Sequence, residues 1–251
     1  MGAAVNASPQ LVSGIEKDSR PASPEFCESL HRAYRLTPDE RRHLKAMVDF
    51  ANNDVSRWAW KDDAETVLKL PWGSETILEG VKPHAAAWVD SMGRVLACNE
   101  VFSTAFRGLD QADSILHWFL RDPRSRVVML DWENELRLAV AWFRALMGQT
   151  GNPVWAQTVL AELSHDEDFA RFWSLGEVAY GRYEHNPYMH MYDRNTGEVF
   201  SMLVQLTAAG VHQGPMQFYL GMRLPYAGGP ELLRKAGMAA GGFANYGVPG
   251  H

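Results

Sequence analysis

The chain has 251 residues, of which 46% are hydrophobic and 22% are charged. These fractions are typical of a globular protein with an ordinary core, and they exclude a collagenous or fully disordered chain. Lys and Arg number 24 against 30 Asp and Glu, which gives a formal net charge of −6. Because phosphate binding requires an extended positive surface, this balance argues against nucleic acid as a direct partner.

The two cysteines, Cys27 and Cys98, stand far apart and have no metal-binding spacing. Such usage is typical of a reducing compartment. The first residues lack the charged start and continuous apolar run of a signal peptide, and no apolar run is long enough to cross a bilayer. We therefore expect a cytoplasmic protein with no membrane partner.

The N-terminal part of the chain predicts a leader followed by two short helices. Residues 1–22 are small and polar, and they predict a disordered leader. Ser23 and Pro24 start the first helix, and the capping box 37–40 opens the second. The pattern then weakens as far as residue 73. Three tryptophans in this segment are expected to dock onto a core: Trp58, Trp60 and Trp72.

The middle of the chain predicts a β-hairpin and then a block of helices. Segments 84–90 and 94–98 read as its two strands, and Asn99 can cap the helix that follows. The apolar spacing predicts further helices over 114–121, 125–147, 154–163 and from a second capping box at 164–167 onward.

After Gly176 the apolar period changes from helical to alternating, which is typical of strands. The predicted strands are 178–183, 188–193, 198–207 and 214–224. In the last one Phe218 and Leu220 face one way while Tyr219 and Arg223 face the other, so one face is buried and the other is wet or paired. The seven glycines of residues 225–251 predict a loose tail with a short helical patch at 231–236.

This order of elements predicts an α+β fold, in which an antiparallel sheet packs against a block of helices. The expected parts are the leader 1–22, a helical segment with a linker at 23–73, a ligand-binding domain at 74–224 and the tail 225–251. Nine Trp, eleven Phe and eleven Met exceed ordinary usage. They either fill a wide core or line an apolar ligand cavity between helices and sheet.

No strong catalytic motif is present, and the nine histidines never stand three or four residues apart, so we expect neither a metal site nor a cofactor. Cys98 ends a predicted strand just before the Asn99 cap, where a helix N-terminus can lower a thiol pKa. Cys98 is either such an activated thiol or a small buried hydrophobe. If the protein is an enzyme, Cys98 is the candidate nucleophile and His190 or His84 the candidate base.

Several ordered segments resemble the ligand-binding domain of MmyB-like regulators, which are actinobacterial transcription factors with an XRE-type helix-turn-helix. They are WVDSMGRVLACNEVFSTAF, SILHWFLRDPRSR, DWE, FRALMG, ELSHDEDFARFWSLGEV and HNPYMHMYDRNTGEVFSMLVQL. The resemblance implies a PAS-like fold whose cavity takes a fatty acid or another small, largely apolar metabolite. The candidate ligand-binding residues are then Trp88, Asn99, Phe102, Trp118, Trp132, Trp142, Phe172, Trp173, Tyr192 and Phe218.

The N-terminal region departs from the family pattern. Residues 23–48 resemble the final helix of the family's DNA-binding domain and the helix after it, without the recognition helix that reads the major groove. In the ligand region, Cys98 replaces a large aromatic residue and Gly176 replaces a histidine. Both changes alter the predicted pocket.

Three functional hypotheses follow. The first is a binding protein that takes an apolar or fatty-acid-like metabolite without contacting DNA itself. The second is an enzyme that was recruited from this fold and hydrolyses or cyclises a natural-product intermediate of secondary metabolism. The third is a transcription regulator that acts through a partner subunit or as a homodimer.

Overall fold

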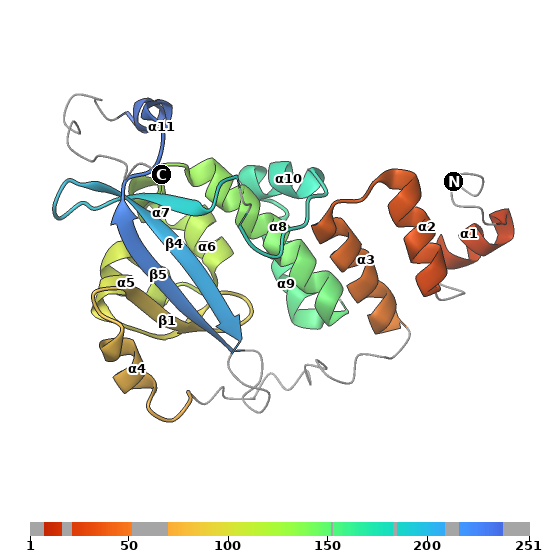
Figure 1. Cartoon of the computed structure of the whole chain (residues 1–251), viewed down its shortest axis with the longest axis horizontal. Helices are drawn as coiled ribbons and strands as arrows, with labels where there is room; N and C mark the ends of the chain where they lie inside the picture. Colours follow the sequence, from red (N-terminus) through yellow and green to blue (C-terminus); the bar gives the residue numbers. More distant parts are fainter. Residues whose placement is uncertain are drawn as a thin grey trace, which may run out of the picture. The chain divides into compact units, whose positions relative to one another are not determined.

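The computed structural model describes residues 8–16, 22–51, 70–151, 153–182, 185–208 and 216–237 (Figure 1). The chain forms two compact units. The helical unit consists of Met1–Ala64 and Val140–Gly181, and the sheet unit consists of Glu65–Ala139 and Arg182–His251. No helix in the described ranges is both long enough and apolar enough to span a bilayer.

The helical unit contains the two predicted N-terminal helices. Its elements are α1 (Pro9–Glu16), α2 (Pro24–Tyr34), α3 (Pro38–Ala51), the second half of α8 (Trp132–Thr150), α9 (Val154–Leu163) and α10 (Glu167–Ser174). The Ser23 side chain accepts from the Phe26 N–H at 3.2 Å, as its predicted cap role requires. Thr37 and Glu40 form both bonds of the predicted capping box.

Helix α1 lies inside the segment that was predicted to be a disordered leader. Val12 on α1 packs with Phe26 on α2, and the partly buried Leu11 and Leu30 pack against this pair. The prediction of disorder is therefore wrong for residues 9–16. A single turn of apolar residues has too short a pattern to reveal a helix that is stabilised by a neighbouring helix.

The sheet unit is built on one antiparallel sheet. Its strands are β1 (Ala85–Val89), β2 (Val95–Cys98), β3 (Tyr188–Tyr192), β4 (Val199–Ala208) and β5 (Gln217–Pro225). Within the described residues they follow the order β2-β1-β5-β4-β3. The helices are α4 (Ser74–Gly80), α5 (Glu100–Ala105), α6 (Ile115–Arg121), α7 (Pro123–Val128), the first half of α8 and α11 (Pro230–Lys235). The predicted α+β class and the predicted hairpin, β1 with β2, are confirmed.

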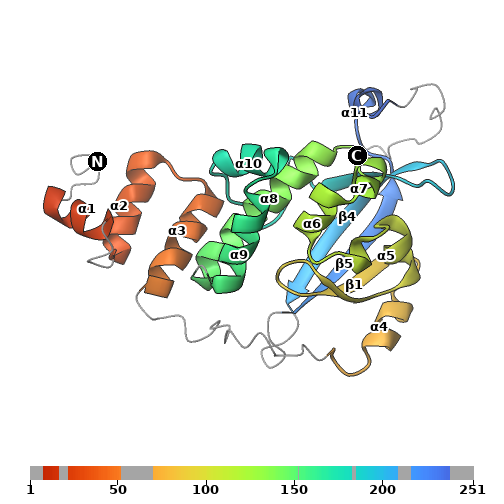
Figure 2. The ribbon, with the colours of Figure 1, turned by 180° about the vertical axis from the view of Figure 1, so that it is seen from behind.

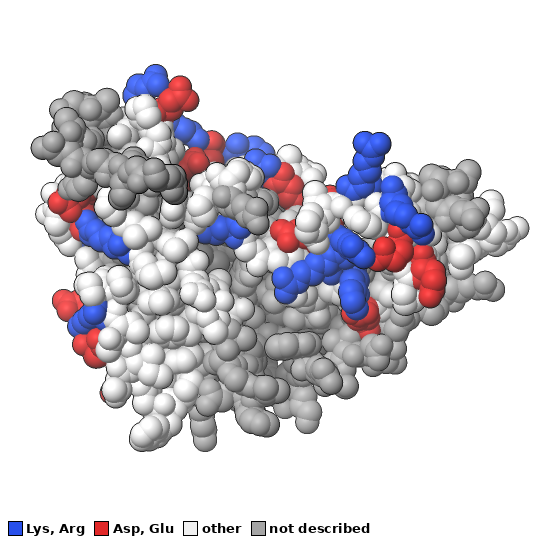
Figure 3. Space-filling model, in the orientation of Figure 1, with Lys and Arg blue, Asp and Glu red and all other residues white. Residues whose placement is uncertain are grey.

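One face of the sheet is covered by α5, α6 and α7, as Figure 2 shows from behind. Tyr219 on β5 points to this face, since its ring contacts that of Phe102 on α5 at 5.3 Å. Phe218 points to the other face and packs on Trp88 at 4.9 Å. That outer face, where Figure 3 shows it over β4 and β5, carries few charged side chains. The side chains of β5 alternate between the two faces as predicted, and the side that carries Tyr219 and Arg223 faces the helices.

Two predicted elements near the middle of the chain are wrong in detail. The helix predicted over 125–147 is interrupted between α7 and α8, where Met129 forms a bridge with Met191 and the Leu130 N–H donates to the His190 carbonyl at 2.9 Å. This break depends on a strand far away in sequence, so helical periodicity cannot reveal it. The cap of α10 is Asp166, which accepts from the Phe169 N–H, rather than Ser164.

Two further predictions fail. No strand forms over 178–182, where the Ala179 N–H donates instead to the Ala141 carbonyl of α8. Trp72, which was expected to dock, is 98% exposed. Trp58 and Trp60 lie outside the described residues.

Candidate functional site

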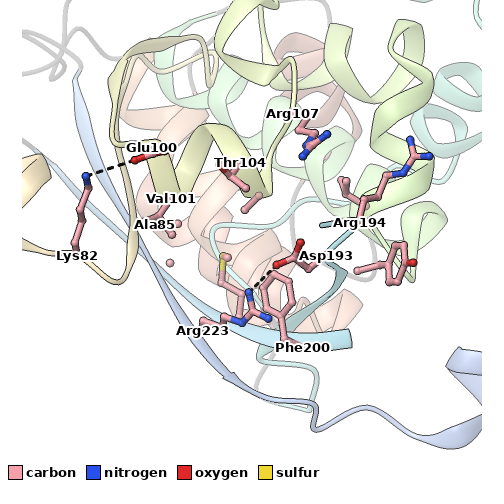
Figure 4. A pocket seen from close by; sticks show the side chains of 15 residues that line it. Lys82, Ala85, Glu100, Val101, Thr104, Arg107, Asp193, Arg194, Phe200 and Arg223 are labelled. Carbon is pink, nitrogen blue, oxygen red and sulfur yellow. Dashed lines mark hydrogen bonds and ion pairs between the residues drawn. The ribbon is translucent and has the colours of Figure 1, made fainter. Parts of the chain in front are cut away.

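The sheet unit contains a half-open cavity of about 280 Å³ between α5 and the covered face of the sheet (Figure 4). Strands β1, β4 and β5 form its floor, α5 forms one wall, and the turn between β3 and β4 forms one end. The lining residues are Lys82, Ala85, Glu100, Val101, Thr104, Ala105, Arg107, Val128, Tyr192, Asp193, Arg194, Phe200, Met202, Gly221 and Arg223.

Three small residues are part of the cavity lining. Ala85 on β1 and Gly221 on β5 are direct cross-strand partners, and Ala105 faces the cavity from α5. A Cβ atom at position 221 would lie 2.5 Å from Met202 Sδ and 3.0 Å from Tyr219 Cε1. A side chain at position 221 would therefore press on Met202 and Tyr219, and Met202, which lines the cavity, would have to shift.

Asn99 fixes α5 over this space. Its Oδ1 accepts from the Phe102 N–H at 3.0 Å, which caps α5, and from the Ala86 N–H of β1 at 3.1 Å. Its Nδ2 donates to the carbonyls of Leu78 and His84 at 3.0 and 2.9 Å. The side chain is 2% exposed, so all four bonds are made away from water. One residue thus ties α5 to β1 and to α4.

Two of the cations around the cavity are neutralised by carboxylates. Arg223 pairs with Asp193 at 3.1 Å and with Glu198 at 2.9 Å. Lys82 pairs with Glu79 at 2.8 Å and lies 3.9 Å from Glu100. Burial alone would raise the pKa of Asp193. Hydrogen bonds from the Asn195 N–H and from Arg223 outweigh this effect, and the pKa of Asp193 lies below its ordinary value. Asp193 therefore stays ionised and anchors the β3–β4 turn to β5.

The other two cations at the cavity have no carboxylate partner among the described residues. Arg107 donates to the Asn195 side-chain oxygen, a neutral acceptor. Arg194 has no hydrogen bond or ion pair within the described ranges. Figure 4 shows both residues at the same end of the cavity, opposite Lys82 and Glu100. That end therefore carries uncompensated positive charge.

Most of the predicted ligand-binding residues are packing residues. Of the ten, Tyr192 lines the cavity. Phe102 packs against Phe106 and Tyr219, and Trp88 packs against Phe218. Asn99 has the structural role given above.

The remaining predicted aromatic residues are also placed by packing. Trp118 is fully buried and its Nε1 donates to the Arg107 carbonyl at 2.9 Å. Trp132 donates from Nε1 to Ser125 Oγ at 3.0 Å. Three others belong to the helical unit: Trp142 is half-buried, Phe172 is buried, and Trp173 stacks on Phe169 with centroids 5.7 Å apart.

Of the predicted catalytic residues, Cys98 and His190 are far apart. Cys98 is on β2 and His190 on β3, the two edge strands, which are four strand spacings or roughly 19 Å apart. Burial and the Asp110 charge raise the pKa of the Cys98 thiol, the opposite of activation. The sheet therefore does not bring Cys98 and His190 together. His84 lies just before β1, and its Nδ1 is buried without a hydrogen-bond partner in the described part of the chain.

His190 has a different partner from the predicted one. Its Nδ1 lies 2.9 Å from Ser201 Oγ, which also accepts from the Ala227 N–H at 2.8 Å. Ser201 is fully buried, so this pair holds β3 and β4 together rather than meeting a substrate. Among the described residues, no group of His, Cys, Asp and Glu could hold a metal ion.

The sequence pattern pointed to aromatic side chains as the lining of the cavity, and it gave no prediction for Ala85, Ala105 and Gly221. The available signal was the opposite one: the run of three alanines at 85–87 and a glycine inside a strand, which often marks a place where the backbone is closely approached. Arg107, which follows α5, and Arg194, in the β3–β4 turn, gave no local signal. Their common location depends on contacts between segments far apart in the sequence.

A family model described as "MmyB-like transcription regulator ligand binding domain" matches residues 71–214. The match covers more than half of the chain. It includes strands β1 to β4 and helices α4 to α10, and it ends before β5. A search of curated proteins gives no significant match.

Proposed function

Because the chain belongs to the MmyB-like transcription regulator ligand binding domain family, we propose that it binds a small, largely apolar metabolite in the cavity beneath α5. The observation that carries this proposal is the cavity itself, which lies between the sheet and α5. Its floor includes Phe200 and Met202, which suit an apolar ligand body.

The cavity volume sets the size of the ligand. Ligand pockets commonly measure about 300–1,000 Å³, so 280 Å³ lies at the small end. A fatty-acid-like ligand of medium chain length fits this space, whereas a long-chain one would need the cavity to expand.

We also propose that the protein does not itself contact DNA. The net charge of −6 supports this proposal, since a DNA-binding surface requires clustered Lys and Arg that face phosphate. A mobility-shift assay at low salt tests it, because electrostatic binding is strongest there. A shift that weakens steeply with added salt would refute the proposal.

Native mass spectrometry of freshly purified protein tests the binding function. We expect either a retained small molecule or, with empty protein, uptake of medium-chain alkyl compounds. A ligand at about 100 times its Kd should also stabilise the fold by about 2.7 kcal/mol, which thermal denaturation detects.

A matched pair of variants assigns the binding to this cavity. Ala105→Phe places a ring in the cavity and should abolish uptake. Ser103→Phe, on the same helix and outside the lining, should leave it unchanged. Equal uptake by both variants would place the ligand elsewhere. We propose no reaction for this cavity, since Cys98, His84 and His190 are not among its lining residues.

A further inference from the structure

We propose that the open edge of β4, residues 204–208, pairs with the same edge of a second copy of this chain. The two segments run antiparallel about a two-fold axis through Leu206 and join the two sheets into one. This inference goes beyond the proposed function and does not depend on any ligand. It stands on the part of β4 that lacks a neighbouring strand on one side.

The second half of β4 is paired on one side alone. β5 runs beside β4 up to Ala208 (Figure 1), whereas β3 pairs with β4 only up to Leu203. Just before β3, residues 185–187 are not part of a strand. Among the described residues, no strand or isolated bridge therefore meets this edge of 204–208. Backbone N–H and C=O groups along such an edge form a template for another strand.

The open edge lacks the features that usually protect an edge strand. Natural edges carry Lys or Pro, or a β-bulge twists them away from other chains. β4 contains no charged residue and no proline, and its register with β5 is uninterrupted. Leu206 is 48% exposed, and Gln205 and Thr207 are exposed as well. A partner strand can therefore reach this edge.

The sequence of the open edge matches its own antiparallel copy. With the axis at Leu206, the two leucines lie opposite each other, Gln205 lies opposite Thr207 of the second copy, and Val204 lies opposite Ala208 of the second copy. Every pair then joins residues on the same face of the sheet. Gln205 and Thr207 have no hydrogen bond within the described ranges, so their side chains can bond to each other across the axis.

The absence of charge favours a second copy as the partner. The chain has a net charge of −6, and identical charged segments would repel each other when paired. The open edge is uncharged, and the outer face of β4 and β5 beside it carries few charged side chains (Figure 3). The same segment can therefore oppose itself in a closed two-fold dimer, which is the commonest symmetry of soluble oligomers.

Sedimentation equilibrium of the full chain over a range of concentrations tests the inference. We expect a monomer–dimer equilibrium in the micromolar range, because the paired segments are short and make a small interface. Leu206→Lys places two like charges opposite each other and should weaken the dimer at least about tenfold. Val127→Lys is the matched control, since Val127 on α7 is 40% exposed and its substitution should leave the dimer unchanged.

Disulfide cross-linking locates the axis without adding a charge. Opposite Cα atoms of an antiparallel pair lie about 4.5–5.5 Å apart, a distance that a disulfide can span. Under mild oxidation, Leu206→Cys should therefore form a disulfide-linked dimer faster than Val127→Cys. The parent chain, which keeps Cys27 and Cys98, gives the background rate.

The outcomes decide whether the edge is an interface and which partner it takes. A monomer at every concentration, with equal cross-linking of the two cysteine variants, overturns the proposal. A dimer that Leu206→Lys does not weaken lies on another surface and overturns it as well. Cross-linking of Leu206→Cys to a different polypeptide in cells, while the purified chain stays monomeric, assigns the edge to another protein and overturns the second copy. None of these outcomes bears on ligand uptake by the cavity.

Discussion

Replacing Asn99 with alanine should destabilise the sheet unit without any direct effect on ligand contact. The Asn99 side chain makes four buried hydrogen bonds of 2.9–3.1 Å, to two backbone N–H groups and two carbonyls. Each is worth about 1 kcal/mol net, and the deletion leaves the four backbone groups without a partner. The expected loss is therefore about 3–5 kcal/mol, a large part of the total stability of an ordinary domain.

Urea denaturation at 25 °C, together with hydrogen exchange of the Ala86 and Phe102 amides, measures this loss. Both amides lose their acceptor in Asn99→Ala and should exchange faster. Asn99→Asp keeps the two acceptor functions, so its Phe102 amide should remain protected while the bonds to Leu78 and His84 are lost. Asn195→Ala, at an exposed turn, is the control.

A result in which Asn99→Ala unfolds within about 0.5 kcal/mol of the parent chain would refute the structural role of Asn99. If affinity for the ligand were lost at the same time, the original prediction of a ligand-binding Asn99 would be right instead.

Three further predictions concern buried groups. Arg182→Met breaks the buried pair with Glu135, whose atoms lie 2.5 and 2.8 Å apart, and should cost about 3–5 kcal/mol in urea denaturation; a loss under about 1 kcal/mol would contradict the burial of the pair. Burial lowers the folded pKa of His43 and of His190 below 6.5, so the unfolded chain binds more protons and the unfolding free energy should fall as pH drops through about 6.5. A stability curve that is flat between pH 8 and pH 5.5 would disprove this. Because burial raises the pKa of Cys98, iodoacetamide at pH 8 should alkylate it more slowly than a free thiol, and faster alkylation would count against its placement.

Local features of the sequence predicted much of the fold. Ser23, Thr37 and Asn99 each cap a helix as expected, because a cap depends on residues only three positions apart. The hairpin of β1 and β2 was equally local. The break after α7 was not, since it requires Met129 to meet Met191 across the fold.

The site was less predictable than the fold. The abundance of tryptophan and phenylalanine suggested an aromatic lining, and the structure uses Trp118 and Phe102 to pack helices onto the sheet. The cavity depends on Ala85 and Gly221, which are distant in sequence and become neighbours only through the pairing of β1 with β5. Composition reports which side chains are present, and a cavity depends on where large ones are missing.

The pairing of Ala85 with Gly221 separates what determines the shape of the cavity from what determines its charge. Ala85 and Gly221 lie inside the sheet, and a Cβ atom at position 221 would press on Met202 Sδ in the cavity lining. Arg107 and Arg194 line the cavity from connecting segments outside the strands. Substitutions in the strands would therefore change the shape of the cavity, whereas substitutions in the connecting segments would change its charge and leave the strand pairing intact.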